Sequence, residues 1–274
     1  MRLSFVQPRM ELQPYIESFW LFESPLGMPP TDTSMAAPNG CPKLIIPYEN
    51  SLVSIADGRT SISHEGGLYF VGNRDTQTHI HSTARETGFV VVEFSPCGAF
   101  PFFGIPMEET ASGLFDSEVL FGKWGREVPE GLRNLEVVDQ KVNFIQEQLV
   151  ALLRRPPRHN ALVEFCVGAL RSTGGRFTIG ELERRTGYSR RYLDLLFKRH
   201  VGLSPKVLAG IFRFQTFYRK WARGLPYDVV KEDLYDYYYD QAHFIKEFKR
   251  MTGYSPRQYT LGVSNEFGRR ISLT

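Results

Sequence analysis

The chain has 274 residues, 42% of them hydrophobic and 23% charged, a composition typical of a globular protein and not of a disordered one. No apolar run approaches the roughly 18 residues that span a bilayer. Residues 1–10 also lack the apolar core of a signal peptide. We therefore expect a soluble cytoplasmic protein without membrane association. Its three cysteines are too few for a disulfide framework, and none forms the Cys-x-x-Cys pair of a structural zinc site.

The net charge of +3 is unevenly distributed along the chain. Residues 1–155 hold 12 basic and 19 acidic residues, a net charge of −7, whereas residues 156–274 hold 21 and 11, a net charge of +10. Such asymmetry predicts two domains, the second of which faces an anionic partner. We expect a β-rich sensing or dimerisation domain over 1–155, ending in helices, and a DNA-binding domain over 156–274.

The first half contains short apolar stretches separated by Gly, Pro, Asn and Asp, which is typical of an antiparallel barrel or sandwich. The expected strands are Lys43–Pro47, Leu52–Ala56, Gly67–Gly72, Thr78–His81 and Phe89–Phe94. A short helix is expected at Met107–Glu109. A long one is expected at Asn134–Arg155, ended by Pro156 and Pro157. The predicted fold class is therefore α+β in two domains, with an all-α second domain that begins at a helix over His159–Ser172.

An internal repeat dominates the second half. Phe197–Lys206 (FKRHVGLSPK) and Phe248–Arg257 (FKRMTGYSPR) share Phe, Lys, Arg, Gly, Ser and Pro in register at an offset of 51 residues. A fixed offset indicates a duplicated structural unit. In each copy, a leading helix, a turn and a second helix with a basic face predict a helix-turn-helix.

The first unit is expected over about 178–201. Thr178 caps a helix over Ile179–Thr186, Gly187 forms the turn, and Ser189 caps a second helix that Gly202 ends. A linker helix over about 205–223 leads to the second unit at about 227–252, in which Asp240 caps the second helix. Two such helices on a rigid linker suit two major-groove segments about 34 Å apart, with surrounding Lys and Arg neutralising phosphates.

The motifs GYSRRYLDLLFKRHVGLSPK and YYDQAHFIKEFKRMTGYSP resemble the DNA-binding domain of AraC-type transcription regulators over residues 160–260. The segments ESFW, APNGCPKLI and VEFSPCGAFPFFGIPMEE resemble the β-rich N-terminal domain of one subgroup of that family. The resemblance implies two helix-turn-helix units, a cupin-like or uncharacterised first domain, and sequence-specific DNA binding. The DNA-contacting residues it implies are Ser189, Arg190, Arg191, Asp194, Lys198, Arg213, Gln241, Ala242, His243 and Lys246.

Two departures from the family pattern concern the leading helices. Glu183 and Asp233 stand where the family usually has alanine, and the second turn has Tyr237 or Tyr238 in place of glycine. A tyrosine at positive φ would cost on the order of 1 kcal/mol. These changes leave open a second unit that only packs and contacts no bases.

Candidate sites in the first half are less specific. His79 and His81 lie on one strand face and could bind a metal together with His64 or Glu93. Aromatic residues that include Trp20, Tyr69 and Phe94 could line a small-molecule pocket. No nucleophile–base pair or phosphate loop is present, so we predict no enzymatic activity and no cofactor.

The favoured hypothesis is a transcription regulator that binds double-stranded DNA as a monomer or homodimer. A small-molecule effector and RNA polymerase are possible further partners, and the protein would associate with the bacterial nucleoid when bound to DNA. The alternative is a cupin-like, metal-dependent enzymatic domain attached to a DNA-binding tail. The sequence does not indicate the effector, the operator or the direction of regulation.

Overall fold

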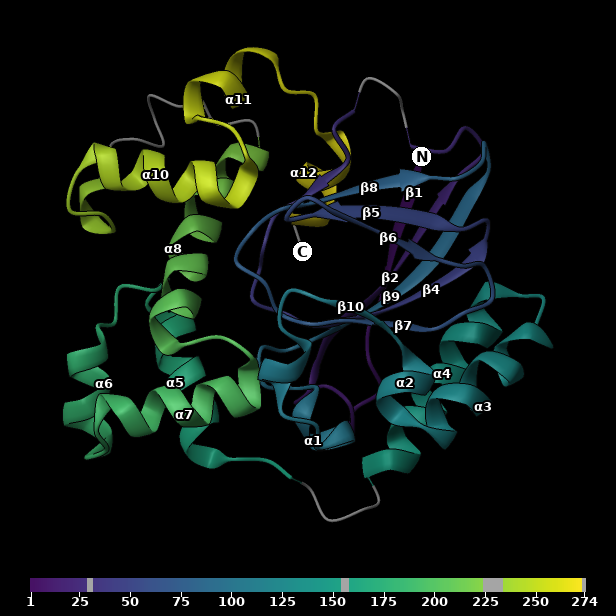
Figure 1. Ribbon diagram of the computed structural model, residues 1–274, viewed down its shortest axis with the longest axis horizontal. Helices are drawn as coiled ribbons and strands as arrows, with labels where there is room; N and C mark the ends of the chain where they lie inside the picture. Colours follow the sequence, from purple (N-terminus) through teal and green to yellow (C-terminus); the bar gives the residue numbers. More distant parts are fainter. Residues whose placement is uncertain (29–31, 154–157, 224–233, 273–274) are drawn as a thin grey trace.

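The computed structural model describes residues 1–28, 32–153, 158–223 and 234–272. A two-sheet β-sandwich with helices on one side makes up the first part of the chain, and a group of helices built around one long helix makes up the second (Figure 1). The α+β class and the antiparallel sandwich are as expected. No helix among these residues is long and apolar enough to cross a membrane.

Every strand pair in the two sheets is antiparallel. The larger sheet has the order β1 (Arg2–Val6), β2 (Ile16–Ser24), β9 (Thr87–Phe94), β4 (Lys43–Glu49), β7 (Tyr69–Val71) and β10 (Leu114–Asp116). The smaller sheet has the order β3 (Met35–Ala36), β8 (Thr78–Ser82), β5 (Leu52–Ala56) and β6 (Arg59–Ser63). The five expected strands are all present, but β1, β2, β3, β6 and β10 were not predicted.

Strand β9 lies at the centre of the larger sheet and is buried on both faces. Val90 and Val92 face the helix-covered core, whereas Phe89 and Val91 belong to a second cluster with Trp20 and Leu52. Side chains of a strand alternate between its two faces, so this uninterrupted apolar run serves two cores at once. Burying each such side chain contributes about 1.5–3 kcal/mol.

The helices of the first part follow the sheet and cover its outer face (Figure 1). They are α1 (Phe100–Phe103), the 3₁₀ turn η1 (Met107–Thr110), α2 (Ser117–Phe121), α3 (Lys123–Arg133) and α4 (Val138–Leu153). The expected helix at residues 134–155 corresponds to α4, and its predicted proline stop lies outside the described residues. The short helix expected at Met107 is the 3₁₀ turn.

The second part consists of α5 (Ala161–Ser172), α6 (Ile179–Thr186), α7 (Arg190–Val201), α8 (Pro205–Ala222), the turn η2 (Leu234–Asp236), α10 (Gln241–Thr252), α11 (Pro256–Gly262) and α12 (Glu266–Ser272). Helix α8 contributes to two separate cores. Leu208 and Phe212 pack with α5, α6 and α7, whereas Phe214 and Phe217 pack with α10. Each end of α8 is embedded in a core, so the helix links the two units, which lie at its opposite ends in Figure 1.

The C-terminal helix α12 returns to the β-sandwich. The Asp32 carboxylate accepts hydrogen bonds from the backbone N–H groups of Glu266 (2.7 Å) and Phe267 (3.1 Å), so a residue of the first part caps this helix. Phe267 is 1% exposed and meets the ring of Phe22 edge-on. Two residues before Phe267, the Asn265 side-chain amide accepts a hydrogen bond from the Met35 N–H and donates one to the Met35 carbonyl. Met35 belongs to β3. The two parts therefore share a buried interface.

Candidate nucleic-acid interface and effector cavity

The first helix-turn-helix unit consists of α6 and α7. Thr178 and Glu181 form a reciprocal capping box at the start of α6, and Gly187 ends that helix at φ = 73°. Ser189 then caps α7 by accepting a hydrogen bond from the Tyr192 N–H at 3.4 Å. Glycine adopts this left-handed conformation without steric cost, which accounts for the sharp turn between the helices. The bounds of α6, the turn and both caps are as predicted.

The Glu183 departure has a local explanation. Its carboxylate accepts a 2.7 Å hydrogen bond from the backbone N–H of Arg190, and Arg190 is the first residue of α7. The first four N–H groups of a helix have no partner within the helix, and a negative charge there also suits the helix dipole. Glu183 therefore ties the leading helix to the start of the second helix in place of an apolar contact.

The outward face of α7 carries the predicted contact residues. Ser189, Arg190, Arg191 and Lys198 are exposed, and Asp194 is half-buried with an oxygen 4.0 Å from the Arg190 guanidinium. These side chains line a shallow hollow on α7 together with Tyr192 and Leu195. Tyr192 and Leu195 were not among the contact residues expected from the sequence. Leu195 is 60% exposed, which is the signal that separates it from the buried Leu193.

The second unit presents α10 in the same way. Asp240 caps the helix through a 2.7 Å hydrogen bond from the His243 N–H, and Gly253 ends it at φ = 80°. Gln241, Ala242, His243 and Lys246 are all exposed. Asp233 and most of the leading helix expected at residues 227–237 lie outside the described residues.

The turn tyrosines are not strained. Neither Tyr237 nor Tyr238 has a positive φ. Tyr238 is 3% exposed and packs against Phe217 and Phe244, so its ring belongs to the core of the second unit. The energetic cost considered for a tyrosine in place of the turn glycine therefore does not arise.

Arg213 on α8 is held within the protein. Its guanidinium donates to the Gly175 carbonyl at 3.0 Å and to the Glu247 carboxylate of α10 at 3.4 Å, and it lies 5.7 Å from the Tyr238 ring centroid. Only 17% of its side chain is exposed. Among the residues expected to contact DNA, Arg213 is the one placed between the two units, where it joins α8 to α10 and to the turn that follows α5.

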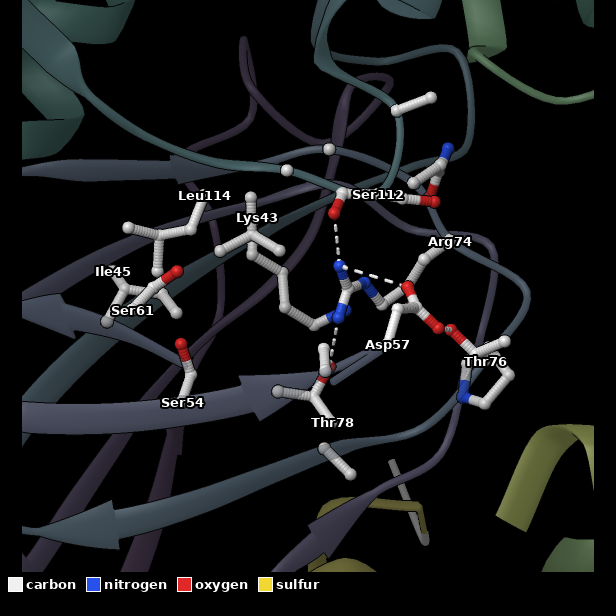
Figure 2. Close-up of a pocket in the computed structure, with 18 of the residues that line it drawn as sticks. Lys43, Ile45, Ser54, Asp57, Ser61, Arg74, Thr76, Thr78, Ser112 and Leu114 are labelled. Atoms are coloured by element: carbon white, nitrogen blue, oxygen red, sulfur yellow. Dashed lines mark hydrogen bonds and ion pairs between the residues drawn. The ribbon is translucent and has the colours of Figure 1, made fainter. Parts of the chain in front are cut away.

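A cavity of 580 Å³ lies between the two sheets, and its lining residues Ala36, Ile45 and Ile80 also pack against the Trp20 cluster. Its walls combine apolar residues such as Ile45 and Leu114 with hydroxyl side chains and with charged ones, as Figure 2 shows. The hydroxyl side chains are Ser54, Ser61, Thr76, Thr78 and Ser112, and the charged residues are Lys43, Asp57, Arg59 and Arg74. Three cations and one carboxylate give the lining a formal charge of +2.

Arg74 is the most buried of the three cations that line this cavity, with 13% of its side chain exposed. Its positive charge has no close carboxylate partner in the described part of the chain. Its guanidinium donates to Thr78 Oγ1 at 2.9 Å and to the Ser112 carbonyl, and its distance to the Asp57 carboxylate is 3.9 Å (Figure 2). Its Nε is buried without a hydrogen-bond partner. Burial lowers the pKa of Arg74, although the nearby carboxylates oppose this effect. Lys43, by comparison, has the Glu93 carboxylate at 3.3 Å.

The other predicted residues of the first domain lie elsewhere. Trp20, Tyr69 and Phe94 are all buried, and none of them lines the cavity. His79 Nδ1 lies 3.1 Å from the Thr33 carbonyl, and His81 is exposed. The described residues contain no group of three His, Cys, Asp or Glu side chains that could hold a metal ion.

Two family models match the chain. Residues 4–115 match a "Domain of unknown function (DUF6597)", and residues 182–261 match a "Helix-turn-helix domain". The second match covers most of α6 and α11 and all of α7, α8 and α10, and so includes both helices with the predicted contact residues. The first covers nearly all of the β-sandwich, which is the domain that contains the cavity.

Solved structures similar to the chain include ToxT and EutQ. ToxT from Vibrio cholerae is 12% identical with a TM-score of 0.49, covering 91% of this chain and 100% of ToxT. ToxT bound to (E)-4-(8-methylnaphthalen-1-yl)but-3-enoic acid is 13% identical with a TM-score of 0.48, covering 94% and 100%. EutQ from Clostridium difficile is 16% identical with a TM-score of 0.26, covering 34% and 65%.

The comparison with curated proteins gave no match. The assignment therefore rests on the two family matches and on the capped, paired helices that they cover. The chain carries an AraC-type helix-turn-helix domain at its C-terminal end and a β-rich domain of unknown function before it.

Proposed function

We propose that the protein is a sequence-specific transcription regulator that binds two successive major-groove segments of double-stranded DNA and responds to a small molecule held in its β-sandwich. The main support is the matched pair of helices α7 and α10. Each has 12 residues, begins at a side-chain cap and exposes its polar face, and α8 holds the two rigidly. One helix fits one major groove, so a single chain can contact two groove segments.

In this proposal the N-terminal ends of both helices approach the bases. Arg190 and Arg191 in the first unit, and Gln241 and His243 in the second, have side chains that can hydrogen-bond base edges. Ser189, Lys198 and Lys246 supply phosphate contacts and positive charge, while Asp194 and Ala242 lie beside the bases. Counterion release from phosphates makes such binding strongly dependent on salt.

The remaining functional assignments follow from DNA binding. A regulator acts at the chromosome, so we propose a cytoplasmic protein associated with the nucleoid, without an enzymatic role. Each chain carries two recognition helices, so a monomer suffices for one site, and a homodimer would span a longer operator. RNA polymerase is the natural further partner of a DNA-bound regulator.

The test is selection of binding sequences from random double-stranded DNA by the full-length protein, followed by mobility-shift assays. Arg191→Ala should weaken the selected site at least about fivefold while affecting random DNA less, because a base contact discriminates by about 1–3 kcal/mol. Arg126→Ala is a control of equal charge change on α3 and should leave both affinities unchanged. The absence of any salt-sensitive binding by the wild-type protein would overturn the proposal.

A further inference from the structure

The segment Asn73–Thr78, which connects β7 to β8, lies between the cavity and both recognition helices. Arg74, Thr76 and Thr78 line the cavity, as does Asn73. Asn73, Asp75 and Gln77 also contact the C-terminal ends of α7 and α10. The 73–78 segment is thus the wall of the ligand cavity on one side and a support for the DNA-binding helices on the other.

Asn73 supports the first recognition helix. Its side-chain amide donates a 2.8 Å hydrogen bond to the carbonyl of Val201, the last residue of α7, and both groups are buried. The last carbonyl groups of a helix have no partner within the helix, so this contact satisfies one of them. Next to it, the His200 ring packs against the Phe100 ring at an interplanar angle of 51°, with ring centroids 4.1 Å apart. The end of α7 is therefore fixed to the first domain.

Asp75 and Gln77 support the second recognition helix. The Asp75 carboxylate pairs with the guanidinium of Arg250 in the last turn of α10. Gln77 lies against Gly253, the residue that ends α10, where an added Cβ would come within 2.8 Å of the Gln77 side-chain nitrogen. A movement of this short segment would therefore reach both helices at once.

The cavity side of the segment offers an incompletely bonded cation. Arg74 leaves its buried Nε without a partner, and its nearest carboxylate, Asp57, is 3.9 Å away and 43% exposed. Leaving a buried donor unbonded costs roughly 1–3 kcal/mol, and more for a charged group. Thr76 Oγ1 donates a 2.8 Å hydrogen bond to Asp57, so the Asp57 carboxylate interacts with both Arg74 and Thr76. An oxyanion near Arg74 would bond the free Nε–H and compensate the positive lining.

We propose that the cavity binds a small organic oxyanion, a carboxylate or a phosphate ester, on Arg74, and that the 73–78 segment transmits its binding to both recognition helices. This inference rests on the proposed function for its biological meaning. An oxyanion that bonds Arg74 competes with Thr78, Ser112 and Asp57 for its N–H groups. Asn73 and Asp75 are the covalent neighbours of Arg74, so a shift of Arg74 changes their contacts with α7 and α10. Binding then shifts the conformational equilibrium because the two arrangements hold the oxyanion unequally.

The coupling is tested by hydrogen–deuterium exchange of the full-length protein followed by mass spectrometry. Arg74→Gln should increase exchange several-fold at two separate sites, residues 198–203 and 249–254. Thr78→Val, a substitution of similar shape that removes an acceptor from Arg74, should produce a smaller increase at both. Arg59→Gln is the matched control, because Arg59 lines the same cavity but is exposed and lies on β6.

Substitutions that remove one contact each should affect the ends of α7 and α10 separately. Asn73→Ala should increase exchange at 198–203 alone, and Asp75→Asn at 249–254 alone. Unchanged exchange at both ends in Arg74→Gln and Thr78→Val, or equal changes in Arg59→Gln, would overturn the coupling. Failure of the wild-type protein to bind DNA would instead overturn the proposed function and leave this comparison intact.

The ligand class is tested by thermal unfolding of the full-length protein with a panel of aliphatic and aromatic carboxylates, sugar phosphates and neutral polyols. At least one oxyanion should raise the melting temperature of the wild-type protein and lose this effect in Arg74→Gln. Arg85→Gln, a control at an exposed arginine that does not line the cavity, should keep the effect. The carboxylate and phosphate arms distinguish the two sources of the charge. The assignment would be overturned if no compound or only the polyols stabilised the wild-type protein. It would also be overturned if an oxyanion stabilised Arg74→Gln as much as the wild type.

Discussion

The carboxylate of Glu183 on α6 accepts a hydrogen bond from the backbone N–H of Arg190 on α7, at 2.7 Å. The contact crosses the turn of the first unit and fixes the angle at which α7 leaves α6. A residue that departs from the family pattern thereby takes over the joining of the two helices, although it does so with a polar bond.

Glu183→Ala should destabilise the protein by about 1 kcal/mol, because the loss of a capping acceptor typically costs 0.5–2 kcal/mol. The measurement is urea unfolding at neutral pH. Glu183→Gln keeps an oxygen acceptor and loses only the negative charge, so it should cost less than the alanine substitution. Equal stability of the alanine variant and the wild type would show that the hydrogen bond contributes nothing.

Leu195→Ala should weaken binding to the preferred DNA site without lowering stability. Leu195 is 60% exposed on the outward face of α7, and an apolar side chain there can contact a thymine methyl group. Leu26→Ala is the control, because Leu26 is 67% exposed on the first domain. Competition binding against sites that replace each thymine by uracil, which lacks the methyl group, measures the effect. A loss of affinity equal on all sites would exclude methyl recognition.

Lys246→Ala should reduce the slope of log affinity against log salt concentration by about 1, as expected for one lost phosphate contact. Gln241→Ala should instead change the preferred sequence. Both residues are exposed on α10, and neither belongs to a core cluster. Unchanged slope and unchanged preference in the two variants would show that the second unit only packs against α8.

Cys97 should react with a thiol reagent before the two buried cysteines, and only at alkaline pH. Burial raises the pKa of Cys97 to about 11 and that of Cys166 to about 11, and it also raises the pKa of Cys41. The reactive thiolate is scarce below these values, so the rate should rise about tenfold per pH unit between pH 7 and 10. Cys97 is half-buried, whereas the other two are buried. Rapid reaction of all three at pH 7 would contradict this prediction.

The sequence predicted those elements whose signals are local. The bounds of α6 and β5 coincide with the expectation, and Thr178, Ser189 and Asp240 are caps because a cap acts on the residues that immediately follow it. Strand β2 was missed because it is buried on both faces and has no polar alternation.

The cavity could not be predicted, since its lining comes from both sheets and from distant loops. The role of Arg213 was also hidden, because its partners Gly175 and Glu247 lie 38 and 34 residues away. Residue type identified Arg213 as a possible DNA contact, whereas only the packing of α8 against α10 shows that its charge is already engaged.

The position of Phe267 has a consequence for how the protein folds during synthesis. This ring completes the cluster that contains Phe22, yet it lies 245 residues later in the chain. Domains generally fold in order as the ribosome releases them. Here the β-sandwich is released long before α12 exists, so one of its hydrophobic clusters stays open to solvent until α12 has been synthesised. We expect the nascent sandwich to bind chaperones through this cluster and to release them when α12 docks.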